Sequence, residues 1–150
     1  MNRYGPTVLR LVVGATFAAH GAQKLFGVWN GGGLPATAAM IGSLGLSPAW
    51  PLAIVLGVVE FVGGLMLIGG AYTLWASLAL LVDMVVAIWK VHLPHGYFLA
   101  QGGMEYNVVL VGALLALVLT GAGALSVDGR RARSAEIQAA GRARLRAGKV

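Results

Sequence analysis

Six ionisable side chains interrupt long apolar stretches of this chain, and their types suit proton transfer and the binding of a small polar group. These residues are His20, Lys24, Glu60, Asp83, Lys90 and Glu105. His20 and Lys24 are four residues apart, so they share one face if their stretch is a helix. An ionisable group in hydrocarbon is costly unless it faces protein, water or an opposite charge. We therefore expect the six side chains to converge on a shared polar pocket.

The expected depths of these side chains divide them into two tiers. Counted inward from the expected outer helix ends, His20, Glu60 and Asp83 lie 8, 9 and 10 residues deep. At about 1.5 Å per residue these three share a level near the bilayer centre, and the other three lie near the outer rim. With His20 neutral, the set carries two positive and three negative charges, so either one carboxyl group is protonated or His20 is charged. This pattern indicates a site that titrates, while charged pairs that only fix helix order stay open as an alternative.

The composition excludes an ordinary soluble domain and several classes of cofactor site. Of the 150 residues, 58% are hydrophobic and 11% are charged, whereas about 25% are charged in soluble domains. The chain has no cysteine, which excludes disulfides, thiolate metal sites and iron–sulfur clusters. It also lacks a P-loop, a GxGxxG segment and an HExxH pattern. We expect a multi-pass membrane protein with no metal site and no covalently bound cofactor.

Four apolar stretches are long enough to cross a bilayer as helices and to position the ionisable groups. They are residues 9–27, 52–70, 71–93 and 106–125. Between the first two, residues 35–44 have a proline start and a glycine stop, which predicts a short interfacial helix. The expected fold is an all-α membrane protein, a four-transmembrane-helix bundle with a short interfacial helix in the first outer loop.

Small residues recur at helical spacing on the faces that carry the ionisable groups. They include Gly14 and Gly21 in the first stretch, Gly57 and Gly64 in the second, and Gly112 in the fourth. Small residues let helix backbones approach closely in lipid. We expect close helix contacts at these glycines, with the ionisable groups turned toward neighbouring helices.

The cations are distributed unevenly between the two ends of the expected spans. Seven of the eleven lysines and arginines lie between Arg130 and Lys149, and Arg3 and Arg10 belong to the same end. The positive-inside rule then places both termini in the cytoplasm. We divide the chain into a transmembrane domain, residues 1–128, and a basic tail, residues 129–150, that is disordered or a membrane-surface helix. A cleaved signal peptide ending in the AAHGA segment stays open as an alternative, and nucleic acid is not an expected partner beside membrane spans.

Four sequence blocks resemble the DoxX family of small bacterial membrane proteins. The blocks are LRLVVGATFAAHGAQKLFG, GVVEFVGGLMLIGG, GGMEYNVVL and TGAGALSVDG, in this order within residues 7–129. The residues on recurring family positions are Arg10, His20, Gly21, Lys24, Glu60, Gly64, Gly103, Glu105, Ser126 and Asp128. The resemblance implies a location in the bacterial plasma membrane and an association with quinone-linked oxidoreduction. It also implies membrane or peripheral oxidoreductases as partners.

The leading functional hypothesis is a quinone-associated accessory subunit, with its own catalytic turnover left undecided. Lys24 and Lys90 would stabilise negative charge on a quinone oxygen, while the mid-depth groups would exchange protons. Electrons would come from a partner, because the sequence shows no redox centre of its own. Two alternatives stay open. One is a proton-coupled exporter or channel, working as a homo-oligomer with Glu60 or Asp83 as the coupling carboxyl group; the other is a structural or assembly partner of a membrane complex.

Overall fold

The computed structural model describes residues 4–147, and over that range the chain is helical and contains no strand. The α-helices are α1 (Tyr4–Phe26), α2 (Gly33–Ser43), α3 (Ala49–Gly69), α4 (Thr73–Ala87), α5 (Glu105–Thr120) and α6 (Val127–Ala147). Three short helical turns follow α4, namely η1 (Ile88–His92), η2 (Leu93–His95) and η3 (Leu99–Gln101). Arg3 and Lys149, two of the cations used to orient the chain, lie outside the described residues.

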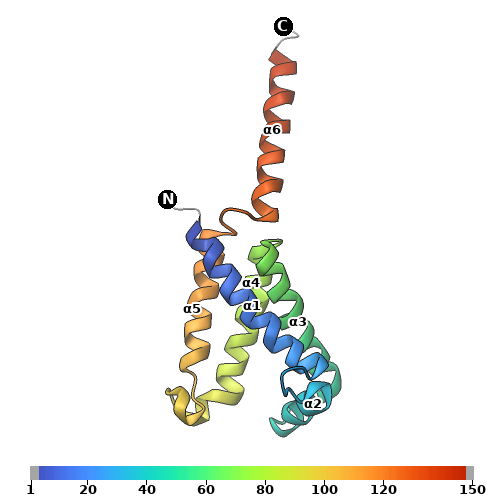
Figure 1. Ribbon diagram of the computed structural model, residues 1–150, viewed down its shortest axis with the longest axis vertical. Coiled ribbons are helices and arrows are strands. Elements are labelled where there is room, and N and C mark those ends of the chain that lie inside the picture. Colours follow the sequence, from blue (N-terminus) through green and yellow to red (C-terminus); the bar gives the residue numbers. More distant parts are fainter. Residues whose placement is uncertain (1–3, 148–150) are drawn as a thin grey trace.

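Helices α1, α3, α4 and α5 run up and down in one bundle, with α2 at the end that lies farthest from the termini (Figure 1). The closest helix pairs are α1 with α3 and α4 with α5. Helix α6 projects away from the bundle, roughly along its long axis, from the end at which the N-terminus lies (Figure 1). The bundle therefore has one end that carries both termini and an opposite end that carries α2.

Two helical segments in the described range are long and apolar enough to cross a membrane, α3 and the continuous segment Thr73–His95. Helix α5 is apolar as well but has 16 residues. The end predicted for the fourth stretch, residue 125, is wrong, since the helix stops at Thr120. Gly121 and Gly123 have φ values of 74° and 70°, a left-handed conformation that glycine adopts readily and that ends the helix.

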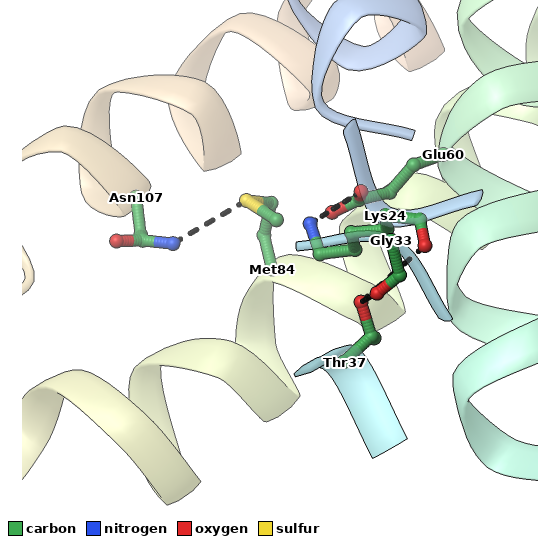
Figure 2. A network of polar contacts seen from close by, with 6 residues as sticks. All are labelled: Lys24, Gly33, Thr37, Glu60, Met84 and Asn107. Atoms are coloured by element: carbon green, nitrogen blue, oxygen red, sulfur yellow. Dashed lines mark hydrogen bonds and ion pairs between the residues drawn. The ribbon is translucent and has the colours of Figure 1, made fainter. Parts of the chain in front are cut away.

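The short helix predicted for residues 35–44 is confirmed as α2, which begins slightly earlier, at Gly33. Ala38 and Ile41 of α2 form a buried cluster with Ala53 of α3. The hydroxyl group of Thr37 donates a hydrogen bond to the carbonyl oxygen of Gly33 at 2.9 Å (Figure 2). This packing fixes α2 against the start of α3.

A layer of apolar side chains fills the centre of the bundle and draws on all four of its long helices. We call it the leucine layer; its members are Phe17, Leu67, Leu80, Leu114 and Leu117. The four leucines are 0% exposed and Phe17 is 1% exposed. Bulk solvent does not reach side chains that are buried this completely. The leucine layer therefore separates the two ends of the bundle.

Glycines bring α1 and α3 into backbone contact, as their spacing predicts. A Cβ atom on Gly14 would lie 2.7 Å from the carbonyl oxygen of Gly64, and one on Gly21 would lie 2.6 Å from the Cα atom of Phe61. The expectation is wrong for Gly112 of α5, where an added Cβ atom would have no neighbour within 4 Å. The close approach is thus a property of the α1–α3 pair, and it sets the side chains of these two helices directly opposite one another.

We expect the substitution Gly21→Ala to destabilise the bundle, because the added methyl group has no room beside the backbone of Phe61. Overpacking of this kind costs about 1–3 kcal/mol, so the midpoint of thermal unfolding in detergent should fall by several degrees. The matched control is Gly112→Ala, which should keep or raise the midpoint because alanine favours a helix by about 1 kcal/mol over glycine. Equal midpoints for the two variants would contradict the close α1–α3 contact.

Candidate ligand-binding site

A cavity of about 500 Å³ lies in the half of the bundle next to α2. In this half the α1–α3 pair and the α4–α5 pair separate from each other (Figure 1). All five helices from α1 to α5 contribute side chains to the cavity wall, and most of these side chains are apolar. Cavities of about 300–1,000 Å³ with an apolar wall and a few polar groups are typical of small-molecule sites. The cavity is therefore the candidate functional site.

Five of the six residues selected from the sequence line this cavity. They are His20, Lys24, Glu60, Asp83 and Lys90. They come from α1, α3, α4 and the turn η1, which are far apart along the chain but adjacent in the fold. The structure thus brings most of the intramembrane ionisable groups to one space.

Lys24 and Glu60 form an ion pair between α1 and α3, with 2.5 Å between Nζ and Oε2 (Figure 2). The Glu60 side chain is 4% exposed and the Lys24 side chain is 24% exposed, so the carboxylate is the more deeply buried partner. The prediction that the Lys24 ammonium group lies in an outer tier, apart from Glu60, is therefore wrong. Its flexible four-carbon stem carries the ammonium group from the rim to the level of Glu60.

Asp83 of α4 belongs to the same cluster of charges. The charges of Glu60 and Lys24 and a side-chain hydrogen bond with Glu60 all act on its carboxyl group. Its Oδ2 atom is buried and has no hydrogen-bond partner among the described residues. Buried polar atoms in folded proteins nearly always have a partner, and those without one call for an explanation. Asp83 Oδ2 is therefore an acceptor that a bound ligand can satisfy.

His20 and Lys90 occupy more open parts of the cavity wall. His20 is exposed, and its ring centroid lies 6.4 Å from that of Tyr106. Lys90 belongs to η1, a π-helical turn, and its Nζ atom lies 4.1 Å from the centroid of the Trp89 ring. π-Helical turns are rare and occur often at functional sites. The ammonium group of Lys90 thus lies against the aromatic face of Trp89 in the cavity wall.

Glu105, the sixth selected residue, does not line the cavity. Its Oε2 atom accepts a hydrogen bond from the backbone N–H group of Leu99 at 3.0 Å. This contact holds the turn η3 against the first turn of α5. The structure therefore gives Glu105 a role in shaping the loop before α5.

The cavity wall contains polar side chains that the sequence analysis did not select, namely His92, Tyr106 and Asn107. Asn107 is 6% exposed, and its amide group donates a weak hydrogen bond to Met84 Sδ at 3.5 Å, on the α4–α5 side of the view in Figure 2. A single uncharged amide in an apolar run gives little signal in a sequence, which is why Asn107 was missed. Within residues 4–147, no group of three or more His, Asp or Glu side chains is placed to hold a metal ion.

Arg10 holds together the end of the bundle that carries the termini, and it is 2% exposed. Its guanidinium group donates hydrogen bonds to the carbonyl groups of Leu67, Ile68, Ala122, Ala124 and Leu125. The first two carbonyls belong to the last turn of α3, where the helix dipole is negative. The other three belong to the loop after α5. A single buried cation thus ties α1, α3 and this loop together.

Asp128 closes the same end by capping α4. Its carboxylate accepts hydrogen bonds from the backbone N–H groups of Tyr72 at 2.9 Å and Thr73 at 2.8 Å. Burial alone raises the pKa of Asp128, but the hydrogen bonds from Thr73 and Tyr72 and the charge of Arg131 outweigh it and hold the pKa below its ordinary value of 3.8. Asp128 is therefore ionised at neutral pH, as suits the positive end of the α4 dipole.

Comparisons with known proteins show which family and which proteins the chain resembles. A sequence model of the DoxX family matches residues 5–93. An uncharacterized protein of Haemophilus influenzae is 30% identical over 136 residues, which cover 87% of this chain and 95% of that protein. The Bacillus subtilis protein named "Putative oxidoreductase CatD" is 28% identical over 124 residues, which cover 83% of this chain and 84% of that protein. No solved structure matches the chain.

Proposed function

The chain belongs to the DoxX family of membrane proteins, and from this premise we propose that it binds a quinone-type ligand in the cavity beside Lys24, Glu60 and Asp83. In this proposal it is an accessory subunit of membrane oxidoreduction in the bacterial plasma membrane. The observation that carries the proposal is the Lys24–Glu60 ion pair next to the unpartnered Asp83 Oδ2 atom, inside an otherwise apolar cavity.

The proposal includes four membrane-spanning helices with both termini in the cytoplasm. Besides the two long apolar segments, α1 and α5 present exposed apolar side chains on their outer faces, for example Val8 and Val12 on α1 and Val109 and Leu119 on α5. A lipid environment accommodates such faces, whereas water does not. The Arg10 charge does not oppose insertion of α1, because backbone carbonyls surround it. The basic α6 then lies on the cytoplasmic side by the positive-inside rule.

A quinone head group suits the polar part of the cavity. Its carbonyl oxygens accept hydrogen bonds from an ammonium group such as that of Lys24, and its ring suits the apolar wall. In the reduced quinol form a hydroxyl group can donate a hydrogen bond to Asp83 Oδ2. Reduction of a quinone to a quinol takes up two electrons and two protons. The carboxyl groups of Glu60 and Asp83 would pass the protons, and a partner oxidoreductase would supply the electrons. The printed name of the Bacillus subtilis relative supports a redox setting.

A proton-coupled channel, part of one of the two alternatives from the sequence, has less support. A channel needs a continuous polar path, whereas the leucine layer closes the bundle between the cavity and the end that carries the termini. Its four leucines are 0% exposed and come from three helices. The cavity is thus closed on one side, as suits a binding site.

The test of the proposed function is the binding of a decyl-tailed benzoquinone to the purified protein in lipid nanodiscs. We expect saturable binding, and we expect Glu60→Gln to weaken it about tenfold or more, because the variant loses the carboxylate that holds the Lys24 ammonium group in the cavity through a charged hydrogen bond worth about 1.5–3 kcal/mol. Glu105→Gln is the matched control, since it makes the same chemical change outside the cavity and retains a hydrogen-bond acceptor for Leu99. Absence of saturable binding, or equal weakening by both substitutions, would contradict the proposal.

A further inference from the structure

We propose that the ligand enters the cavity sideways from the lipid, through an opening between α3 and α4, and that it keeps a hydrocarbon tail in this opening while bound. This inference rests on the proposed function and specifies its ligand class: a membrane-dissolved amphiphile with a polar head and an apolar tail, in contrast to a water-soluble quinone.

Two apolar stripes at helical spacing face the cavity from α3 and α4. On α3 the stripe consists of Leu52, Val55, Leu56 and Val59, and on α4 it consists of Ala79, Val82 and Val86. Residues spaced by three, four and seven share one side of a helix. Stripes of this kind normally close on each other in a packed bundle. Here both line the same cavity, so the seam between α3 and α4 stays open beside it.

The side chains at this seam line the cavity and also reach the outer surface of the bundle. Val55 is 57% exposed, Val82 is 65% exposed and Val86 is 42% exposed. Lining residues that are also largely exposed mark the openings of a cavity, and these three valines mark an apolar mouth. His20 and Tyr106, which also line the cavity and are exposed, mark a second and more polar opening between α1 and α5. The apolar mouth lies between α3 and the segment Thr73–His95, the two segments that are long and apolar enough to cross a membrane. It therefore opens toward lipid.

The polar groups lie behind this apolar mouth. Glu60 follows the α3 stripe by one residue and is 3% exposed, and Asp83 adjoins Val82 on α4. A molecule with its polar head at Glu60, Asp83 and Lys24 would thus have its apolar part at Val55, Val82 and Val86. At the α2 side the cavity wall is apolar, and its lining residues are Met40, Ile41, Leu44 and Leu46. The order of polar and apolar groups matches an amphiphile that arrives from the membrane.

The test compares two probes in nanodiscs, a decyl-tailed benzoquinone and the same head group without a tail, with affinities expressed as mole fractions in the lipid. Val82→Trp places a large side chain in the mouth. We expect it to weaken binding of the tailed probe about tenfold or more and to change binding of the tail-less probe by less than about twofold, since the smaller molecule fits behind the indole ring. Val86→Trp should have the same effect on both probes. Agreement between the two variants would show that the result does not come from misfolding of one of them.

The matched control is Val85→Trp, because Val85 is an exposed valine of α4 that does not line the cavity. It should bind both probes like the unsubstituted protein, and size-exclusion profiles should show that all three tryptophan variants are folded. Equal losses for both probes, or no loss for the tailed probe, would overturn the lateral route while leaving the proposed function in place. Failure of the unsubstituted protein to bind either probe would instead contradict the proposed function.

Discussion

Replacement of Arg10 by methionine is expected to prevent formation of a stable bundle. The guanidinium group donates hydrogen bonds to five backbone carbonyl groups, and the side chain is 2% exposed. Each hydrogen bond to a charged group contributes about 1.5–3 kcal/mol, and each carbonyl left without a donor carries a further cost. Even a loss of about 5 kcal/mol reaches the whole stability of many domains. The measurement is the yield of monodisperse protein after detergent extraction, followed by thermal unfolding.

Two further variants test whether the positive charge of Arg10 or the shape of its guanidinium group stabilises the bundle. Arg10→Lys keeps the charge but has a single nitrogen that cannot reach carbonyls in both α3 and the loop after α5, so it should recover little of the stability. Arg133→Met, which removes an exposed cation from α6, should leave the yield and the unfolding midpoint unchanged. A folded Arg10→Met protein with an unchanged midpoint would contradict the role assigned to this residue.

The second large effect is expected from substitutions in the Lys24–Glu60 ion pair. The single and double variants should change thermal stability and ligand binding to different extents. Lys24→Met leaves the Glu60 carboxylate, which is 4% exposed, without its partner. Breaking a buried pair from one side costs about 3–5 kcal/mol, and the partial exposure of Lys24 places the expected loss near the lower value. The measurement is thermal unfolding in detergent at neutral pH, with the quinone-binding titration run on the same samples.

The double variant Lys24→Met/Glu60→Gln is the critical comparison for this pair. Replacing both partners removes the ion pair and leaves no unpaired charge at position 24 or 60, so much of the lost stability should return, with Asp83 as the remaining carboxyl group of the cluster. Ligand binding should stay weak, because neither the ammonium donor nor the carboxyl group is present. A double variant that regains both stability and binding would show that the ion pair serves only to fix α1 against α3.

Several features of the fold could be predicted from the sequence because they depend on local patterns. The apolar stretches and the proline and glycine boundaries locate the middle of each helix and predict α2, although α1 begins at Tyr4, before the predicted residue 9, and α5 ends at Thr120. Glycine spacing predicts the close contact of α1 with α3. The membership in the DoxX family, inferred from four sequence blocks, is confirmed by the match over residues 5–93. The number of membrane crossings and the orientation of the chain remain predictions.

Other features depend on three-dimensional contacts that residue types do not encode. The sequence marks Arg10 as a charge in an apolar helix, but its partners are backbone carbonyls, which are present at every residue. The Lys24 ammonium group reaches Glu60 because of the length and rotamer of the lysine side chain. An estimate of depth from residue number along a helix gives the position of the backbone and does not include this reach. The π-helical turn around Lys90 and the place of Asn107 in the cavity wall likewise have no signature in residue spacing.

The central claim is that side chains from α1, α3 and α4 face one ligand cavity, and a crystal structure of the protein grown in lipid with the decyl-tailed benzoquinone tests it most directly. We expect density for the head group with a carbonyl oxygen within about 3 Å of Lys24 Nζ, and with the tail leaving between Val55 and Val82. Density for the quinone only on the outer surface of the bundle, with the cavity collapsed onto its own side chains, would contradict it.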